Sequence, residues 1–171
     1  MKLNRIDQLK VTLADSLIRL MKKKSFDSIS VCEICRMAGV GRTTFYRRLD
    51  KQRPKEDLIT FRIVHGYNEY KEGLKDKGDD GHNLLVYLYS IKKQILLFLD
   101  NGLLNEVMDA VRIISVPEVD ESKSAAYVIS FLTYGFFGIV RQWVKFRLDE
   151  TPEEVEKRFK KILSKGGIKG K

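Results

Sequence analysis

The sequence has few of the residues that build disulfide scaffolds and metal centres. Its 171 residues include two cysteines, two histidines and three prolines. The cysteines have no second pair and no nearby histidine, so a disulfide framework and a zinc site are both disfavoured. The sequence predicts no metal ion and no cofactor.

Long apolar runs are also missing. No run reaches the roughly 18–20 residues that a membrane span needs, and the first ten residues, MKLNRIDQLK, lack the apolar core of a signal peptide. The 43% hydrophobic content is still enough to bury a core. We therefore expect a folded cytoplasmic protein with no membrane partner.

Catalytic patterns are absent as well. His65 and His82 lie in different segments, and neither a phosphate-binding glycine loop nor a serine elbow occurs. The sequence therefore predicts no catalytic residue and no enzyme. Strand-like alternation is absent too, whereas apolar residues recur at helical spacing, so we expect an all-α fold. Helices are predicted over residues 3–24, 54–76, 82–99, 120–148 and from 151 onwards, and a short helix is predicted near residues 103–114.

Two shorter helices are predicted within residues 30–49, which read SVCEICRMAGVGRTTFYRRL. Ser30 and Glu33 have the spacing of a capping box, which starts a helix. Gly39 suits the left-handed backbone that ends one. A second short helix begins near Gly41, with Phe45 and Leu49 facing inwards. The second helix has a polar surface rich in arginine and threonine. Two helices joined by a glycine turn, the second with this surface, indicate a helix-turn-helix motif, and we expect the long first helix to pack behind it.

The charge distribution agrees with this motif. Residues 1–60 hold 14 Lys/Arg and 7 Asp/Glu, a net charge of +7, whereas residues 61–171 hold 18 and 16, a net charge of +2. Charge alone is also explained by a solvated surface. Its coincidence with the motif favours a polyanionic partner, namely DNA.

Cys32 and Cys35 form a C-x-x-C pair, a spacing that also occurs in redox and metal sites. Both lie within the first helix of the motif. Cys35 falls on its apolar side and Cys32 on a more exposed side. We interpret Cys35 as core and Cys32 as a spectator thiol.

Residues 26–59 resemble the DNA-binding domain of TetR-family transcriptional regulators. The resemblance rests on Phe26, Ile29, Ser30, Val31, Ile34, Ala38, Gly39, Val40, Thr44, Phe45, Tyr46, Leu49, Lys55, Glu56 and Leu58. It implies a three-helix DNA-binding domain over residues 1–53 and a helical ligand-binding and dimerisation bundle over residues 54–171. The second part looks most like short members of the dihydroxyacetone kinase regulator type.

The sequence departs from the family pattern at two places. Gly41 stands where many members have serine, which predicts a weaker cap on the second motif helix. Gln52, Arg53 and Pro54 look inserted before Lys55, which lengthens the link to the next helix and adds a charge near the DNA.

The resemblance assigns the second motif helix to the major groove of DNA. Arg42 and Thr43 are the predicted base contacts, with Arg47 as a third candidate, because arginine pairs with guanine and threonine meets either base edges or a thymine methyl. The predicted phosphate contacts, which set register rather than sequence, are Ser30, Thr44, Tyr46, Arg48 and Lys55. The alternative for each arginine is a solvated side chain.

Family members act as dimers, and the resemblance places the dimer surface on the last two long helices. Gly135 and Gly138 would let a second helix approach closely. The candidate interface residues are Phe131, Tyr134, Gly135, Phe137, Gly138, Val155, Phe159 and Ile162, each of which could equally belong to an ordinary core.

The family also implies a pocket for a small-molecule inducer. Its candidate lining consists of the aromatic residues Tyr67, Tyr87, Phe98, Phe136 and Trp143, for which a place in the core is the alternative. The expected function is therefore that of a dimeric repressor, which binds a palindromic double-stranded DNA operator and is released by an inducer. The alternative is a helical interaction protein whose DNA binding has lapsed.

Overall fold

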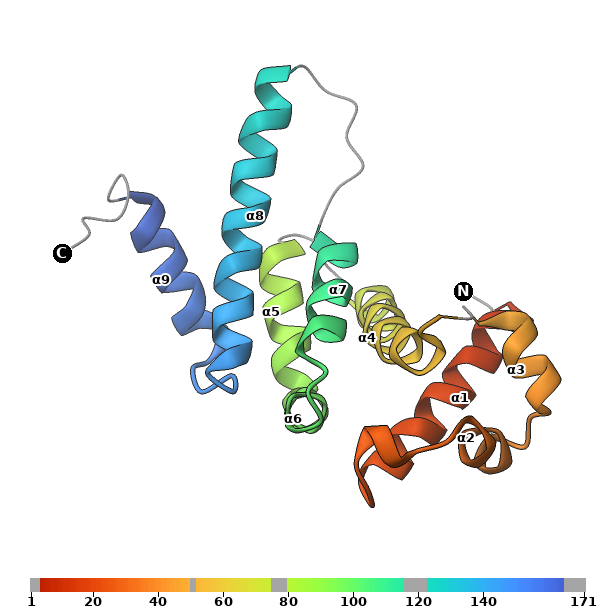
Figure 1. Ribbon diagram of the computed structural model, residues 1–171. Coiled ribbons are helices and arrows are strands. Elements are labelled where there is room, and N and C mark those ends of the chain that lie inside the picture. The colour runs from red at the N-terminus through yellow and green to blue at the C-terminus, as the bar shows by residue number, and fades with distance from the viewer. Residues whose placement is uncertain (1–3, 50–51, 75–79, 116–122, 165–171) are drawn as a thin grey trace. The chain divides into compact units, whose positions relative to one another are not determined.

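The computed structural model describes residues 4–49, 52–74, 80–115 and 123–164. Within these residues the chain forms α-helices and one 3₁₀ helix, η1, and no strand, which confirms the all-α prediction (Figure 1). The helices are α1 (Arg5–Met21), η1 (Phe26–Ser28), α2 (Val31–Ala38), α3 (Arg42–Arg48), α4 (Pro54–Gly73), α5 (Asp80–Ser90), α6 (Lys92–Asp100), α7 (Leu104–Ser115), α8 (Lys123–Lys145) and α9 (Pro152–Ser164).

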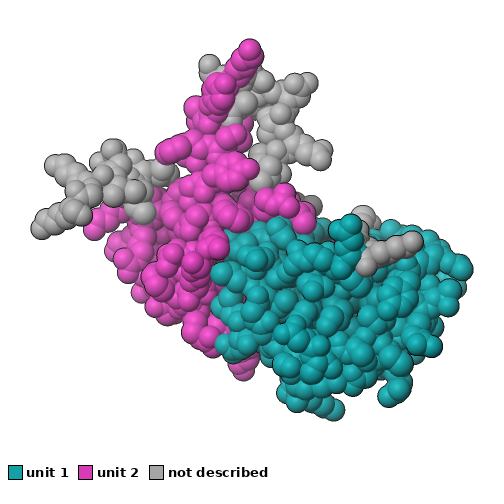
Figure 2. All heavy atoms as spheres, viewed as in Figure 1, with its two compact units in different colours: residues 1–69, 97–110 teal, residues 70–96, 111–171 magenta. Residues whose placement is uncertain are grey.

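The chain divides into two compact units (Figure 2). Unit 1 comprises Met1–Glu69 and Leu97–Ala110, and unit 2 comprises Tyr70–Leu96 and Val111–Lys171. Unit 1 thus contains the three predicted motif helices, most of α4, the end of α6 and the start of α7. These units follow a different division of the chain from the one the family resemblance implies, which lies between residues 53 and 54.

The core of unit 1 is built on the apolar stripe of α1. Leu13 and Leu17 are fully buried, together with Ile34 of α2 and Phe45 of α3. Leu49, just after α3, is 9% exposed, so both residues predicted to face inwards do so. Two short helices cannot bury enough surface alone; α1 supplies the surface against which α2 packs, and α3 packs against α2.

The end of α6 belongs to unit 1 because its apolar residues are buried there. Phe98 is fully buried and Leu103 is 5% exposed. The helix ends at Gly102, whose φ of 76° is left-handed, and the Leu103 N–H turns back to the Phe98 carbonyl at 3.0 Å. This closure satisfies a carbonyl that the helix end would leave free.

Unit 2 holds α5, α8 and α9 around a second apolar core. Leu88 of α5 and Val144 of α8 are fully buried, and Val155 of α9 is 3% exposed. The Trp143 ring stacks on Tyr89 at 6.2 Å between centroids, and its indole N–H donates to the Glu150 carbonyl at 3.1 Å.

Several predicted helix bounds are wrong. The helix predicted over residues 3–24 ends at Met21. The helix predicted over residues 82–99 is two helices that break at Ile91, where the Ser90 hydroxyl donates to the Tyr87 carbonyl at 2.6 Å and the Gln94 N–H turns to the Ile91 carbonyl. A hydroxyl that bonds to the backbone in this way competes with the helical pattern. The helix predicted to run to residue 148 ends at Lys145. The Leu148 N–H donates to the Trp143 carbonyl, which closes the helix end, and the Leu148 side chain is fully buried.

Candidate DNA-binding interface

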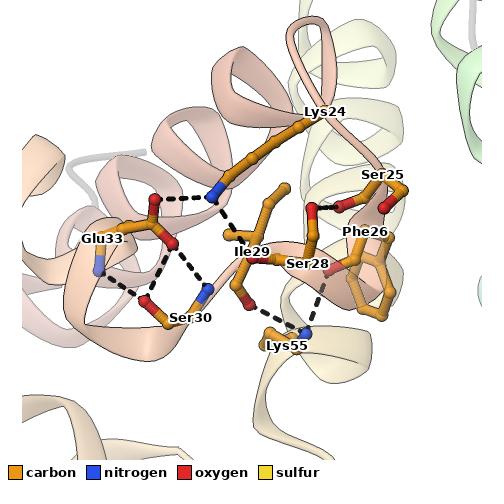
Figure 3. A network of polar contacts seen from close by, with 8 residues as sticks. All are labelled: Lys24, Ser25, Phe26, Ser28, Ile29, Ser30, Glu33 and Lys55. Carbon is orange, nitrogen blue, oxygen red and sulfur yellow. Dashed lines mark hydrogen bonds and ion pairs between the residues drawn. The ribbon is translucent and has the colours of Figure 1, made fainter.

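A capping box starts α2, as the sequence predicts. The Ser30 hydroxyl accepts the Glu33 N–H at 3.3 Å, and the Glu33 carboxylate accepts the Ser30 N–H at 3.0 Å (Figure 3). Lys24 donates to the same carboxylate at 2.5 Å. The Lys24 hydrogen bond, followed by those from Ser30, lowers the pKa of Glu33 to about 2. A charged Glu33 therefore fixes the entry into the motif.

Lys55 holds the turn that precedes α2. Its ammonium donates to the carbonyls of Phe26 and Ile29, both at 3.1 Å, and lies 4.4 Å from the centre of the Phe26 ring (Figure 3). An ammonium has three donors, so these two bonds leave one for a further partner. The sequence predicts Lys55 as a phosphate contact; the structure gives it a bracing position between α4 and η1.

Asn101, at the end of α6, binds the same turn. Its side-chain oxygen accepts the Phe26 N–H at 2.7 Å, while its amide donates to the Leu97 carbonyl at 2.9 Å. Phe26 itself is 4% exposed. Sequence reasoning misses this contact, because an Asn–Gly pair indicates a helix end but not a partner 75 residues away.

The predicted insertion is also anchored within unit 1. Pro54 begins α4, and Arg53 forms an ion pair with Glu106 of α7, whose side chain is 6% exposed. The hydroxyl of Thr60 donates to the Glu106 carbonyl at 3.2 Å. The charge that the insertion adds is therefore used to compensate a buried carboxylate.

The turn between α2 and α3 depends on two glycines. Gly39 has a φ of 67°, and the Val40 N–H bonds to the Cys35 carbonyl at 2.9 Å to close α2. Gly41 precedes α3 and provides no side-chain cap, which confirms the predicted weaker cap. The first backbone N–H groups of α3 therefore have no side-chain acceptor from the cap residue.

The polar residues predicted on α3 are all exposed. They are Arg42, Thr43, Thr44, Tyr46, Arg47 and Arg48. Within the described part of the chain, none of the three arginines has an ion-pair partner, whereas Arg62 binds Asp15 at 2.9 Å. Exposed, uncompensated arginines on a short helix are suited to bind an anion.

Two hollows lie along α3 and collect seven of the eight predicted DNA contacts. The α2–α3 hollow, of about 490 Å³, is lined by Ser30, Arg42, Thr43 and Tyr46, together with Val31 and Cys32. The α1–α3 hollow, of about 690 Å³, includes Thr44, Arg47 and Arg48 in its lining. The structure thus brings these residues together, whereas Lys55 lines neither hollow.

The two cysteines differ as predicted. Cys32 is exposed and Cys35 is buried, and both are free thiols. Burial, followed by the neighbouring Cys32, raises the pKa of Cys35. Among the described residues no group of three or more His, Cys, Asp or Glu side chains could hold a metal ion.

The candidate dimer residues differ in their exposure. Phe131 and Tyr134 are 73% and 65% exposed, and the exposed Gly135 and Gly138 have open space where a Cβ would stand, with no neighbouring atom within 4 Å. Phe137 and Phe159 are half-buried, and Phe159 meets Phe136 edge-on at 5.9 Å. Val155 is buried inside unit 2, and the Ile162 side chain lies outside the described part of the structure.

The candidate pocket aromatics do not form one site within either unit. Tyr67 and Phe98 are buried in unit 1, while Tyr87 and Trp143 are buried in unit 2. Phe136 differs from these four because it lines a cavity of unit 2. That cavity, of about 530 Å³, is lined by Leu84, Ile114, Ser115, Leu132, Thr133, Phe136 and Phe159, with Asp80 and Gly81.

Unit 1 thus has the architecture of a helix-turn-helix DNA-binding protein. Residues 84–165, which include most of α5 and all of α6–α9, match the TetR family model described as a transcriptional regulator C-terminal region. This match supports the assignment of the chain to the TetR family of transcriptional regulators. Comparison with curated proteins gives no match.

Family membership points to a regulator rather than an enzyme. TetR-family regulators bind DNA and dimerise. In the described part of the chain, no helix has both the length and the apolar character to span a membrane.

Proposed function

We propose that the protein is a cytoplasmic, sequence-specific repressor that binds a palindromic DNA operator as a homodimer and is released by a small-molecule inducer. The observation that carries this proposal is α3, a short helix whose exposed arginines have no counter-charge among the described residues. A major groove about 12 Å wide admits such a helix.

The positions of the side chains around α3 suggest which of them read bases. At 100° per residue, Thr43 and Arg47 lie within about 40° of each other and roughly opposite the buried Phe45. They therefore face the floor of the groove. Arg42 begins the helix beside Thr43 and can reach a guanine edge, while Ser30, Tyr46, Thr44 and Arg48 flank this face and meet phosphates.

The exposed face of α8 supports the homodimer. Tyr127 and Phe131 are 75% and 73% exposed, and Tyr134 is 65% exposed, on a helix that also presents two exposed glycines. Large exposed apolar patches mark protein interfaces. A second copy of this helix would cover the patch and present two motifs to two half-sites, separated by about one turn of DNA or more.

The cavity of unit 2 supports an inducer site. It is lined mainly by apolar side chains, with the hydroxyls of Ser115 and Thr133 available to orient a ligand. Pockets for small molecules commonly have this composition. The inducer in this proposal is a mainly apolar molecule that binds unit 2 and disfavours the DNA-bound arrangement of the dimer.

A gel-shift assay with DNA from upstream of the protein's own gene, run at two salt concentrations, tests the function. We expect a specific complex that survives competitor DNA, and Arg42→Ala should weaken it by about 1–3 kcal/mol. An affinity that depends neither on DNA sequence nor on this substitution would overturn the proposal.

Light scattering tests the proposed dimer. Wild type should be dimeric and Phe131→Glu monomeric, while a monomeric wild type at micromolar concentration would contradict the proposed dimer.

A further inference from the structure

The α1–α3 hollow concentrates positive charge beside α3. Arg5, in the first turn of α1, shares this hollow with Arg47 and Arg48 of α3, and the residues that line it include no carboxylate. Figure 1 shows the start of α1 next to α3, and all three arginines are exposed. Sequence reasoning does not select Arg5, because it treats α1 only as the support of the motif.

These arginines have no partner within the described part of the protein. Arg5, Arg47 and Arg48 make no ion pair with any described residue, whereas Arg53, Arg62 and Arg158 each bind a carboxylate. Like charges that share a concave surface repel one another unless an anion is present. The hollow is therefore complementary to an anion, and guanidinium groups match phosphate oxygens particularly well.

The position of the hollow indicates which anion. At 100° per residue, Thr44 and Arg48 lie on one flank of α3, and Arg42 and Tyr46 lie on the other. The second flank lines the α2–α3 hollow. A helix about 10–12 Å wide fills the major groove, so its two flanks face the two different strands.

We propose that the α1–α3 hollow is a second phosphate-binding site, in which Arg5 joins Thr44 and Arg48 in holding one DNA strand. Ser30 and Tyr46, which line the α2–α3 hollow, contact the phosphates of the opposite strand. The ligand is the sugar–phosphate backbone, so Arg5 contributes affinity and register without reading sequence. This inference rests on the proposed DNA-binding function.

The salt dependence of binding tests Arg5 directly. Affinities of the full-length protein are measured by fluorescence anisotropy, for its operator duplex and for a scrambled duplex of equal length, over a series of salt concentrations. Arg5→Gln should weaken binding to both duplexes by the same factor. It should also reduce the slope of log K against log salt by about 0.9 for each lost phosphate contact, which is about 1.8 for a dimer that loses one contact in each protomer.

Arg19→Gln is the matched control. Arg19 lies on the same helix about four turns from Arg5, is exposed, and has no partner among the described residues. Its substitution removes the same charge but should leave the slope unchanged. Arg5→Lys, which restores the charge, should recover most of the slope, and Arg48→Gln should reproduce the loss.

An unchanged slope in Arg5→Gln, or an equal loss in Arg19→Gln, would overturn the inference. A loss confined to the operator duplex would also overturn it, because it would make Arg5 a base contact. If wild type does not prefer its operator but Arg5→Gln still differs from Arg19→Gln, the proposed sequence-specific function fails and the phosphate site stands. A wild type that binds neither duplex overturns both.

Discussion

The N–H of Phe26 donates a 2.7 Å hydrogen bond to the side-chain oxygen of Asn101, 75 residues further along the chain. The first residue lies in the turn that leads into the helix-turn-helix motif, and the second follows the end of α6. Both belong to unit 1. The orientation of the motif is therefore fixed partly by residues from the region that the sequence assigns to regulation.

Asn101→Leu should destabilise unit 1. The substitution keeps the size of the side chain but removes the acceptor, and a buried N–H without a partner costs about 1–3 kcal/mol. Urea unfolding of the variant measures this loss. Asn105→Leu, at an exposed position of α7, is the control and should change stability by less than about 0.5 kcal/mol. Equal stability of the two variants would contradict the role given to Asn101.

Arg53 and Glu106 should be coupled energetically. Arg53→Ala leaves the buried Glu106 carboxylate uncompensated and should cost about 1–2 kcal/mol, a figure reduced because Arg53 is itself 56% exposed. Adding Glu106→Gln should restore part of the loss, since a neutral amide needs no counter-charge. A double-mutant cycle by chemical unfolding measures the coupling. Strictly additive effects would show that the pair does not brace the insertion.

Glu33 should make stability depend on pH in the acid range. Its pKa is about 2 in the folded protein, below the ordinary value of 4.5, so its contribution to the free energy of unfolding is complete above about pH 4.5. That contribution is lost as the pH falls towards 2. Compared with Glu33→Gln, which cannot form the charged bond to Lys24, wild type should have a higher melting temperature at neutral pH. That difference should disappear near pH 2; a difference independent of pH would exclude a stabilising role for the charge.

The two cysteines should differ in reactivity. A maleimide should label exposed Cys32 in the native protein, while Cys35, which is 3% exposed and has a raised pKa, should react only after unfolding. Because Cys32 lines the α2–α3 hollow, operator DNA should slow its labelling. Mass spectrometry of labelled peptides gives both rates. Equal labelling of Cys32 with and without bound DNA would argue against an interface on this side of α3.

Local features of the candidate site could be predicted from the sequence. The capping box at Ser30, the left-handed Gly39 and the buried Phe45 each depend on residues within a few positions, so spacing alone indicates them. The poor cap at Gly41 is visible for the same reason. All-α architecture follows from apolar residues at helical spacing along most of the chain.

Features that depend on distant residues could not be predicted. The partner of Arg53 lies on α7, and that of Phe26 lies at the end of α6. The helix break at Ile91 is local, where the Ser90 hydroxyl bonds to the backbone, but it also escapes prediction because the apolar pattern of residues 82–99 is continuous across it. Aromatic residues such as Tyr87 and Trp143 suit a pocket and a core equally well, and burial decides between them only in the folded chain.

Selection of bound duplexes from a random DNA library tests most directly whether α3 reads sequence. We predict that wild type enriches one sequence with two symmetric half-sites. Arg42→Ala should enrich the same sequence with the preference lost at one base pair in each half-site. Enrichment of no sequence by wild type, or an identical sequence with undiminished preference by Arg42→Ala, would contradict the assignment of α3 as the reading helix.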